Sequence, residues 1–207
     1  MALKGRMSRT IFIANFLALD ISLLFYMGLP APRGTIASRR PIRSEVSQLA
    51  QNLEASPLRN VYFGNSLILP VVQQPGDRPN YVSTNDGEVT QFSSASQYGN
   101  IGLLAHNYLS GKSFSHLALG QAVQLEYQDG KTESFIIAEI LSYRALRPKD
   151  PFSSFQNLNN MAEILSAAQM FERVYAGDHH ITLQTCIAKN GISSWGRLFI
   201  VAIPNPN

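Results

Sequence analysis

The hydrophobic residues of this chain fall mainly into short runs, separated by stretches rich in Gly, Pro, Asn, Asp and Ser. Apolar and polar residues alternate between Ala122 and Tyr127, which is typical of a half-buried strand. The other runs are short and continuous, as buried strands are. We predict strands at 67–72, 101–105, 122–127, 134–141 with a continuation at 143–146, 182–186 and 196–202. The pattern therefore predicts a mainly β domain.

Turn-forming residues indicate how these strands are connected. Asp129-Gly130 is a strong hairpin signal between two of the predicted strands. Pro70 interrupts the run at 67–72, which predicts an edge strand because proline lacks the amide hydrogen that a ladder needs. Residues 73–99 are rich in turn formers, so we predict loop there with at most short strands.

Two segments show helical spacing instead. In the first, Ser44 is followed by apolar residues at helical intervals and Pro57 bounds the segment, which predicts a short helix. In the second, Asn160 as cap and Glu163 three residues later predict a helix that Gly177 ends. The apolar face of this second helix would hold Ile164, Leu165, Ala168 and Phe171.

The amino terminus has the pattern of a signal anchor. Lys4, Arg6 and Arg9 precede an apolar run from Ile11 to Leu29, which at about 1.5 Å per residue is long enough to cross a bilayer core of about 30 Å. Asp20 lies within that run. We expect an uncleaved single-pass membrane helix with the following domain outside the cytoplasm, the alternatives being a cleaved signal peptide and a buried hydrophobic helix.

Composition limits the domain count and the partners. The chain has 207 residues, 45% of them hydrophobic and 15% charged, which is enough for one compact domain and an appendage. The net charge of +3 comes without a dense Lys/Arg cluster, so nucleic acid is not an expected partner. We divide the chain into a cytoplasmic tail and signal-anchor helix at 1–30, a linker with a helix at 31–60, and a catalytic domain at 61–207.

The candidate chemistry lies at strand ends. Cys186 is the only cysteine, so an intrachain disulfide is excluded. A short polar loop with Gly191 joins its strand to the next, and in such a hairpin Arg197 lies across from Cys186. His106 ends the apolar run 101–105. A thiol, an imidazole and a positive charge are what acyl transfer through a thioester needs, although each residue taken singly is more often structural.

The order and setting of these residues resemble the sortase family of cysteine transpeptidases. Thr182-Leu183-Gln184-Thr185-Cys186 matches the family's TLxTC signature, His106 followed by Asn107 matches its histidine, and Arg197 heads the following apolar strand. The resemblance covers about Asn65 to Ile203. It implies a closed β-barrel of about eight strands with short helices. The apolar run from Ile11 to Leu29 adds an N-terminal transmembrane helix to this expected fold.

The same resemblance implies the function and the site. Cys186 would attack a C-terminal sorting motif of surface proteins, His106 would act as acid and base, and Arg197 would hold substrate or oxyanion. The acyl group would pass to an amine on the envelope or on a protein subunit. Thr185 and, as groove residues on the second helix, Met161, Leu165 and Met170 are weaker candidates for substrate contacts. A hydrolytic cysteine peptidase of the same fold and a non-catalytic peptide-binding barrel remain as alternatives.

No metal or cofactor is expected. His179 and His180 are adjacent, and neighbouring residues on a strand point to opposite faces, so they are poorly placed to bind one ion. Calcium is bound by some family members, but no dense carboxylate loop supports it here. His116 is expected at the surface.

Overall fold

The strands of the described chain form one continuous sheet. In the computed structural model, residues 56–206 are described. The predicted membrane run at 11–29 and the predicted helix after Ser44 lie outside these residues; within 56–206, no helix has the length and apolar character needed to span a bilayer. The sheet contains ten strands: β1 (Leu58–Phe63), β2 (Leu67–Gln73), β3 (Val89–Phe92), β4 (Ile101–Leu104), β5 (Ala122–Tyr127), β6 (Thr132–Ala145), β7 (Phe155–Asn157), β8 (Ile164–Leu165), β9 (Ile181–Lys189) and β10 (Ile192–Pro204).

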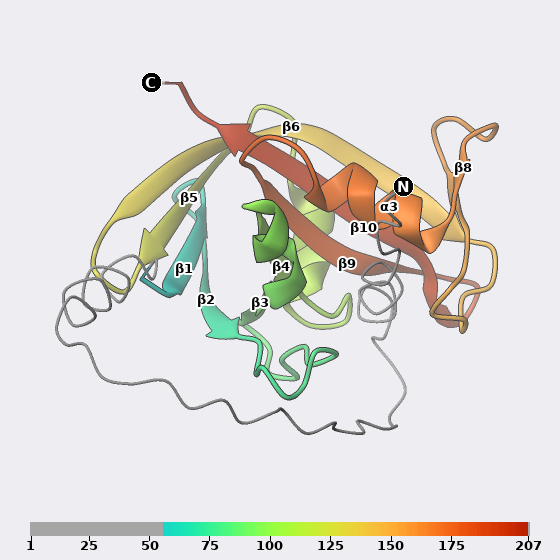
Figure 1. The fold of residues 1–207 in the computed structure, drawn as a ribbon, viewed down its shortest axis with the longest axis horizontal. Coiled ribbons are helices and arrows are strands. Elements are labelled where there is room, and N and C mark those ends of the chain that lie inside the picture. Colours follow the sequence, from blue (N-terminus) through green and yellow to red (C-terminus); the bar gives the residue numbers. More distant parts are fainter. Residues whose placement is uncertain (1–55, 207) are drawn as a thin grey trace, which may run out of the picture.

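Eight of these strands close into a barrel. The pairing runs β10-β9-β4-β3-β2-β1-β5-β6, and an additional pairing of β6 with β10 joins the two ends. The β2–β3 and β4–β9 pairs are parallel and the remaining pairs are antiparallel. β7 and β8 continue the sheet outward from β6, as Figure 1 shows at the far end of the long strands. The predicted mainly β, eight-stranded closed barrel is confirmed.

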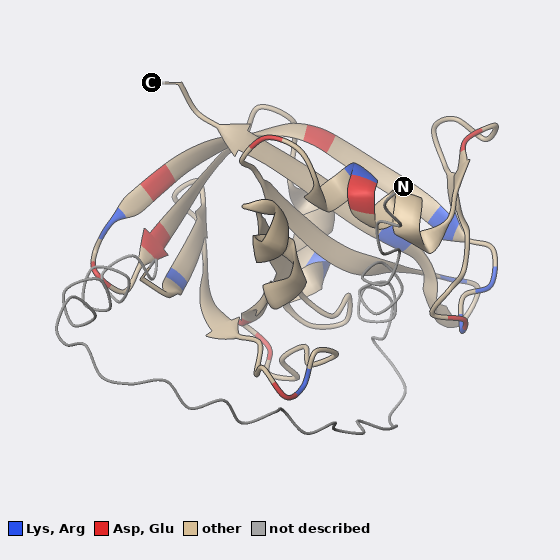
Figure 2. Cartoon of the chain, viewed as in Figure 1, with Lys and Arg blue, Asp and Glu red and all other residues tan. Residues whose placement is uncertain are grey.

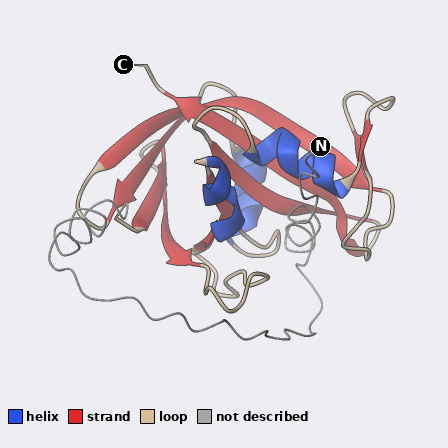
Figure 3. Ribbon diagram, in the orientation of Figure 1, coloured by secondary structure: helices blue, strands red, loops and turns tan. Residues whose placement is uncertain are grey.

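Three short helices accompany the barrel within residues 56–206. They are η1 (Ser93–Tyr98), η2 (Ser110–His116) and α3 (Ala167–Tyr175), the first two being 3₁₀-helices. In Figure 3 the helices lie beside the strands, with α3 over β9 and β10. Each of these strands therefore has one face toward the barrel interior and one face toward α3 or solvent.

Alternation along the strands sends side chains to two separate cores. On β10, Leu198, Ile200 and Ala202 join the interior cluster, whereas Phe199 joins a second cluster outside the barrel. The second cluster includes the buried face of α3, namely Ala167, Met170, Phe171, Val174 and Tyr175. The outer core therefore attaches α3 to the strands that carry the candidate chemistry.

The predicted start of this helix was wrong. Asn160 does not cap it, because residues 164–165 pair with β7 as strand β8. The helix instead begins after Ser166, whose side chain accepts a hydrogen bond from the backbone amide of Gln169 while the Gln169 side chain accepts one from the Ser166 amide. This reciprocal capping box satisfies amides at the helix start that would otherwise lack partners. Gly177 does follow the end of the helix, with φ of 111°.

Three strand predictions also need correction. β2 is not an edge strand: it lies between β1 and β3, although Pro70 pairs only with Asn60 of β1 and the pairing with β3 begins at Val71. β6 is one strand of 14 residues and not two pieces. β10 begins at Ile192, before the predicted start at 196, because a turn of only two residues joins it to β9. A further strand, β1, lies at Leu58–Phe63, where none was predicted.

The burial of Met170 yields a stability prediction. This side chain is fully buried in the outer core, whereas Met161 is 55% exposed. We expect Met170→Ala to lower the free energy of unfolding by about 2–5 kcal/mol, because it removes buried atoms and leaves a cavity. Met161→Ala is the matched control and should change stability by less than about 0.5 kcal/mol. Urea unfolding followed by circular dichroism measures both, and equal effects of the two substitutions would contradict the position given to Met170.

Candidate active site

The β9–β10 hairpin brings the candidate thiol and guanidinium together. Asn190 and Gly191 form the turn with φ of 53° and 77°. Positive φ at both central residues is the geometry that matches the twist of paired strands, and Asn-Gly adopts it readily. The resulting register makes Arg197 the direct partner of Cys186 across the ladder, as predicted from sequence.

Strand β4 brings the candidate histidine to the same place. β4 runs parallel to β9, with Leu104 beside Gln184. The pairing extends one residue further, because the Ala105 amide donates to Gln184 O (3.2 Å) and Thr185 Oγ1 donates to Ala105 O (2.8 Å). His106 is the next residue, so this register places its backbone next to that of Cys186.

The three candidate residues share one face of the sheet. Ala105 and Leu183 point into the barrel, and side chains alternate along a strand. His106 and Cys186 are therefore directed outward, toward the side on which α3 lies. On β10, Arg197 is two residues before Phe199 and therefore points to the same side of the strand, and Phe199 belongs to the outer core. The thiol, the imidazole and the guanidinium thus emerge on one surface from three neighbouring strands.

The loop after His106 is held by several contacts. The His106 carbonyl accepts hydrogen bonds from the amides of Leu109 and Gly111, both at 3.0 Å. The imidazole, which is half-buried, stacks on the Tyr108 ring with centroids 5.1 Å apart and an angle of 23° between the planes. Asn107 Nδ2 donates to Ser193 O (3.1 Å), which ties the loop to β10. The imidazole is therefore presented by a braced loop.

Gly111 is required for this arrangement. A Cβ at this position would lie 2.3 Å from Thr185 Oγ1 and 2.7 Å from His106 O. The same Cβ would lie 2.8 Å from Ala105 O, so any larger residue would disturb the bond between Thr185 and Ala105 that aligns β4 with β9.

Arg197 is a buried cation with a spare donor. The residue is 4% exposed, and its Nη1 donates to Ser194 O (3.1 Å) and Gly196 O (2.9 Å). Its guanidinium carbon lies 6.0 Å from the centroid of the Phe155 ring. Within the described residues, Nε is buried and has no acceptor. A buried donor without a partner is costly, so this group calls for an acceptor that residues 56–206 do not supply.

Cys186 is not part of a disulfide, and 9% of its surface is exposed. Thr185, beside it, is directed into the barrel, where its hydroxyl bonds to Ala105 O. Its observed contact therefore aligns β4 with β9, the strands that carry His106 and Cys186. The predicted contact of Thr185 with substrate stays a prediction.

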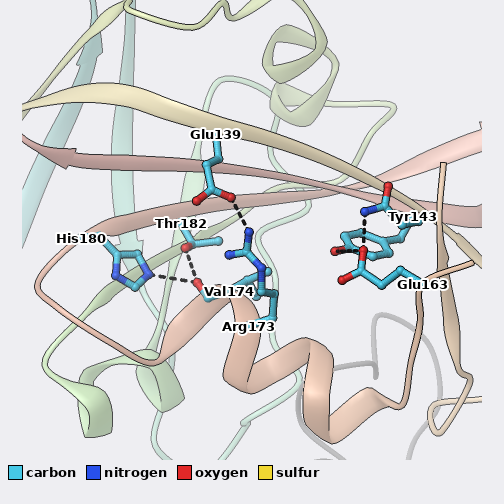
Figure 4. Close-up of polar contacts among 8 residues, drawn as sticks. Glu139, Tyr143, Glu163, Arg173, Val174, His180 and Thr182 are labelled. Carbon is cyan, nitrogen blue, oxygen red and sulfur yellow. Dashed lines mark hydrogen bonds and ion pairs between the residues drawn. The ribbon is translucent and has the colours of Figure 1, made fainter. Parts of the chain in front are cut away.

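α3 is anchored to β9 by polar contacts next to this surface. The Val174 carbonyl accepts from Thr182 Oγ1 and lies 3.0 Å from His180 Nε2, as Figure 4 shows. Tyr175 OH donates to Gln184 Oε1 (2.8 Å), and complete burial raises the pKa of Tyr175 well above its usual value. An Arg173–Glu139 ion pair joins α3 to β6, but both side chains are substantially exposed and such pairs contribute little.

The predicted groove residues are divided among three settings. Met170 is fully buried and cannot line a groove in this structure, so that prediction is corrected. Leu165 lies in β8 and packs against the outer core, and Met161 is exposed in the turn before β8. Neither is on α3, contrary to the prediction.

The remaining histidines lie away from the candidate site. His116 is exposed at the end of η2, as expected. His179 contacts Glu133 and the Gly99 carbonyl, and His180 is buried against carbonyl oxygens. Over residues 56–206, no three His, Cys, Asp or Glu side chains are grouped so that they could hold a metal ion.

Sequence reasoning missed the side chains that brace the site. Tyr108 stacks on His106 within one loop, Ser193 accepts from Asn107, and Ser194 bonds to both Pro148 and Arg197. No local pattern of the sequence marks these three residues. Asn107 was noted as the neighbour of His106, but its bond to β10 could not be read from the sequence.

Comparison with known proteins shows likeness in structure alone. No family model and no curated protein matches the chain. Among solved structures, sortase C-1 from Actinomyces oris matches with a TM-score of 0.50 and 12% sequence identity over 82% of this chain and 84% of that one. Streptococcus agalactiae sortase C1 matches with a TM-score of 0.48 and 14% identity, over 72% and 67% of the two chains. A Clostridium perfringens Sortase D5 transpeptidase matches with a TM-score of 0.48 and 11% identity, over 78% and 88%.

The match to the Actinomyces oris structure establishes the fold, since it extends over most of both chains. The chain therefore has the closed barrel of sortases. At this level of identity the likeness does not carry an activity.

The Thr185 hydroxyl yields a second prediction. Thr185→Val keeps the shape of the side chain but removes the donor to Ala105 O. We expect it to lower the free energy of unfolding by about 1–3 kcal/mol, because a buried carbonyl loses its partner. Thr185→Ser keeps the hydroxyl and should lose less. Denaturant unfolding compares them, and a Val variant at least as stable as the Ser variant would show that the bond does not hold β4 to β9.

Proposed function

We propose that this protein is a sortase-type cysteine transpeptidase. The observation that carries the proposal is that Cys186 and Arg197 are ladder partners on β9 and β10, with His106 two residues beyond the end of the neighbouring β4, on a barrel with the sortase fold. The buried Arg197 Nε, whose acceptor is missing among residues 56–206, supports a ligand oxygen at this place.

In the proposed first half-reaction, the Cys186 thiolate attacks the carbonyl carbon of a peptide bond. A C–S bond forms and the carbonyl oxygen becomes an oxyanion, to which Arg197 donates a hydrogen bond through Nε. The oxyanion then collapses and the C–N bond breaks. The departing amine takes its proton from the His106 imidazolium, and an acyl thioester remains on Cys186.

In the proposed second half-reaction, an amine attacks the thioester carbonyl. His106, now neutral, accepts the proton of the attacking amine. A new amide bond forms, the C–S bond breaks and the Cys186 thiolate is released. Water in place of the amine gives hydrolysis, so the balance between transfer and hydrolysis depends on which nucleophile reaches the thioester.

The substrates and the location belong to the same proposal. The acyl donor is a surface protein with a C-terminal sorting motif, and the acceptor is an amine on the cell envelope or on another protein subunit. Residues 11–29 anchor the chain in the cell membrane with the barrel outside. The signal-anchor pattern of the amino terminus supports this placement.

The proposal is tested by peptide turnover with the full chain. Fluorogenic peptides with LPxTG-like motifs are incubated with and without an added glycine-based amine. We expect amine-dependent ligation that Cys186→Ala abolishes. Arg197→Lys should lower kcat/KM by about 10²–10³-fold, because loss of one oxyanion donor has that effect and lysine lacks the guanidinium geometry.

His116→Ala is the matched control for His106→Ala, since His116 is exposed at the end of η2. The control should keep full activity and His106→Ala should lose most of it. Cleavage without ligation would indicate a hydrolytic peptidase. Binding of a peptide by wild type and Cys186→Ala alike, with turnover by neither, would favour the binding-module alternative.

A further inference from the structure

An open pocket of about 440 Å³ lies beside the candidate active site. Its walls come from the loop between β6 and β7 and from the first residue of β10; the lining residues are Arg147, Pro148, Lys149, Asp150 and Ile192. None of these residues takes part in the chemistry proposed above. The volume lies within the range of sites that hold small ligands or peptide side chains.

Hydrogen bonds connect this pocket to the site residues. Ser194 Oγ donates to the carbonyl of Pro148 in the pocket wall (3.0 Å), and the Ser194 carbonyl accepts from Arg197 Nη1 (3.1 Å). The preceding residue, Ser193, accepts from Asn107 next to His106. A ligand in the pocket therefore contacts the β6–β7 loop, which is joined to the guanidinium of Arg197 through the single residue Ser194.

The charges around the pocket are mainly positive. Arg147 pairs with Asp150 (2.6 Å), the only acid in the lining. Lys149 is exposed, and within the described residues no ion pair engages it. Lys189, the ladder partner of Ile192, lies over the Trp195 ring at 4.8 Å and not against a carboxylate. Figure 2 shows blue segments at this end of β6 and β10.

We propose that this pocket binds an acidic peptide segment. The apolar surface of Pro148 and Ile192 takes an aliphatic side chain, and Lys149, Lys189 and Arg147 attract the flanking carboxylates. Binding itself is independent of the proposed reaction. We further assign the segment to a substrate, close to the bond that is cut or formed. This second step rests on the proposed function.

The shape of the site favours a peptide over an anionic lipid surface. A bilayer presents a flat surface of headgroups, whereas this site is an open pocket between the β6–β7 loop and the start of β10. In a peptide, one aliphatic side chain can fill the pocket while the carboxylates of neighbouring residues meet the surrounding cations.

Trp195 provides a direct probe, because it is the only tryptophan of the chain and lies next to Ser194. The full chain is titrated with a blocked hexapeptide of alternating leucine and glutamate and with its leucine–glutamine twin. We expect a saturable change in Trp195 fluorescence with the glutamate peptide. The glutamine twin should bind about tenfold more weakly, and Lys149→Gln should weaken the glutamate peptide up to about fivefold, as loss of partly exposed ion pairs does.

Lys131→Gln is the matched control. Lys131 is an exposed lysine beside Asp129 in the turn between β5 and β6, so its loss should leave the affinity unchanged. Equal affinity for the two peptides, or equal effects of Lys149→Gln and Lys131→Gln, overturns the proposal. The proposal is also overturned if vesicles containing anionic phospholipid change the Trp195 fluorescence and neither peptide does. That result would assign the pocket and its cations to a membrane surface.

The Cys186→Ala variant separates this proposal from the proposed function. It should bind the glutamate peptide as wild type does. Binding by both proteins without any peptide turnover in the wild type contradicts the transpeptidase and leaves the docking site standing. Turnover that is indifferent to acidic residues in the peptides, without a fluorescence change, contradicts the docking site alone.

Discussion

The parallel pairing of β4 with β9 is the contact on which the candidate site depends. It joins segments that are 80 residues apart at the bond between Thr185 and Ala105. Closing so long a loop is entropically costly, and the cost is offset by the interior core that the barrel encloses. Without this pairing, Cys186 and Arg197 would still face each other across their hairpin, but His106 would have no defined position. The thiol and the imidazole are therefore brought together by barrel closure.

Local features of the chain could be predicted from its sequence because local chemistry determines them. The opposition of Cys186 and Arg197 follows from a short turn between two apolar runs, and the register confirms it. The barrel of about eight strands was predicted from a family resemblance and is confirmed, although strand spacing alone would not have given its closure.

Two kinds of feature could not be predicted: helix ends for which two capping residues compete, and positions that depend on contacts between distant parts of the chain. Two capping signals, at Asn160 and at Ser166, compete for the start of one helix. The second prevails because residues 164–165 pair with β7. Met170 was assigned to a groove from the family resemblance; periodicity could not correct this, because it shows which face of a helix is apolar and not what covers it. Tyr108 acts within an irregular loop and Ser194 between β10 and the β6–β7 loop, and hydrophobic periodicity marks neither contact.

The outward extension of the sheet has a consequence for self-association. Because the barrel closes, each of its strands has a neighbour on both sides, and among residues 56–206 only β8 has a neighbour on one side. An exposed strand edge is a template on which other chains aggregate. β8 is two residues long, which is too short for such templating, so the strand at the open end of the sheet offers little to which another chain could add.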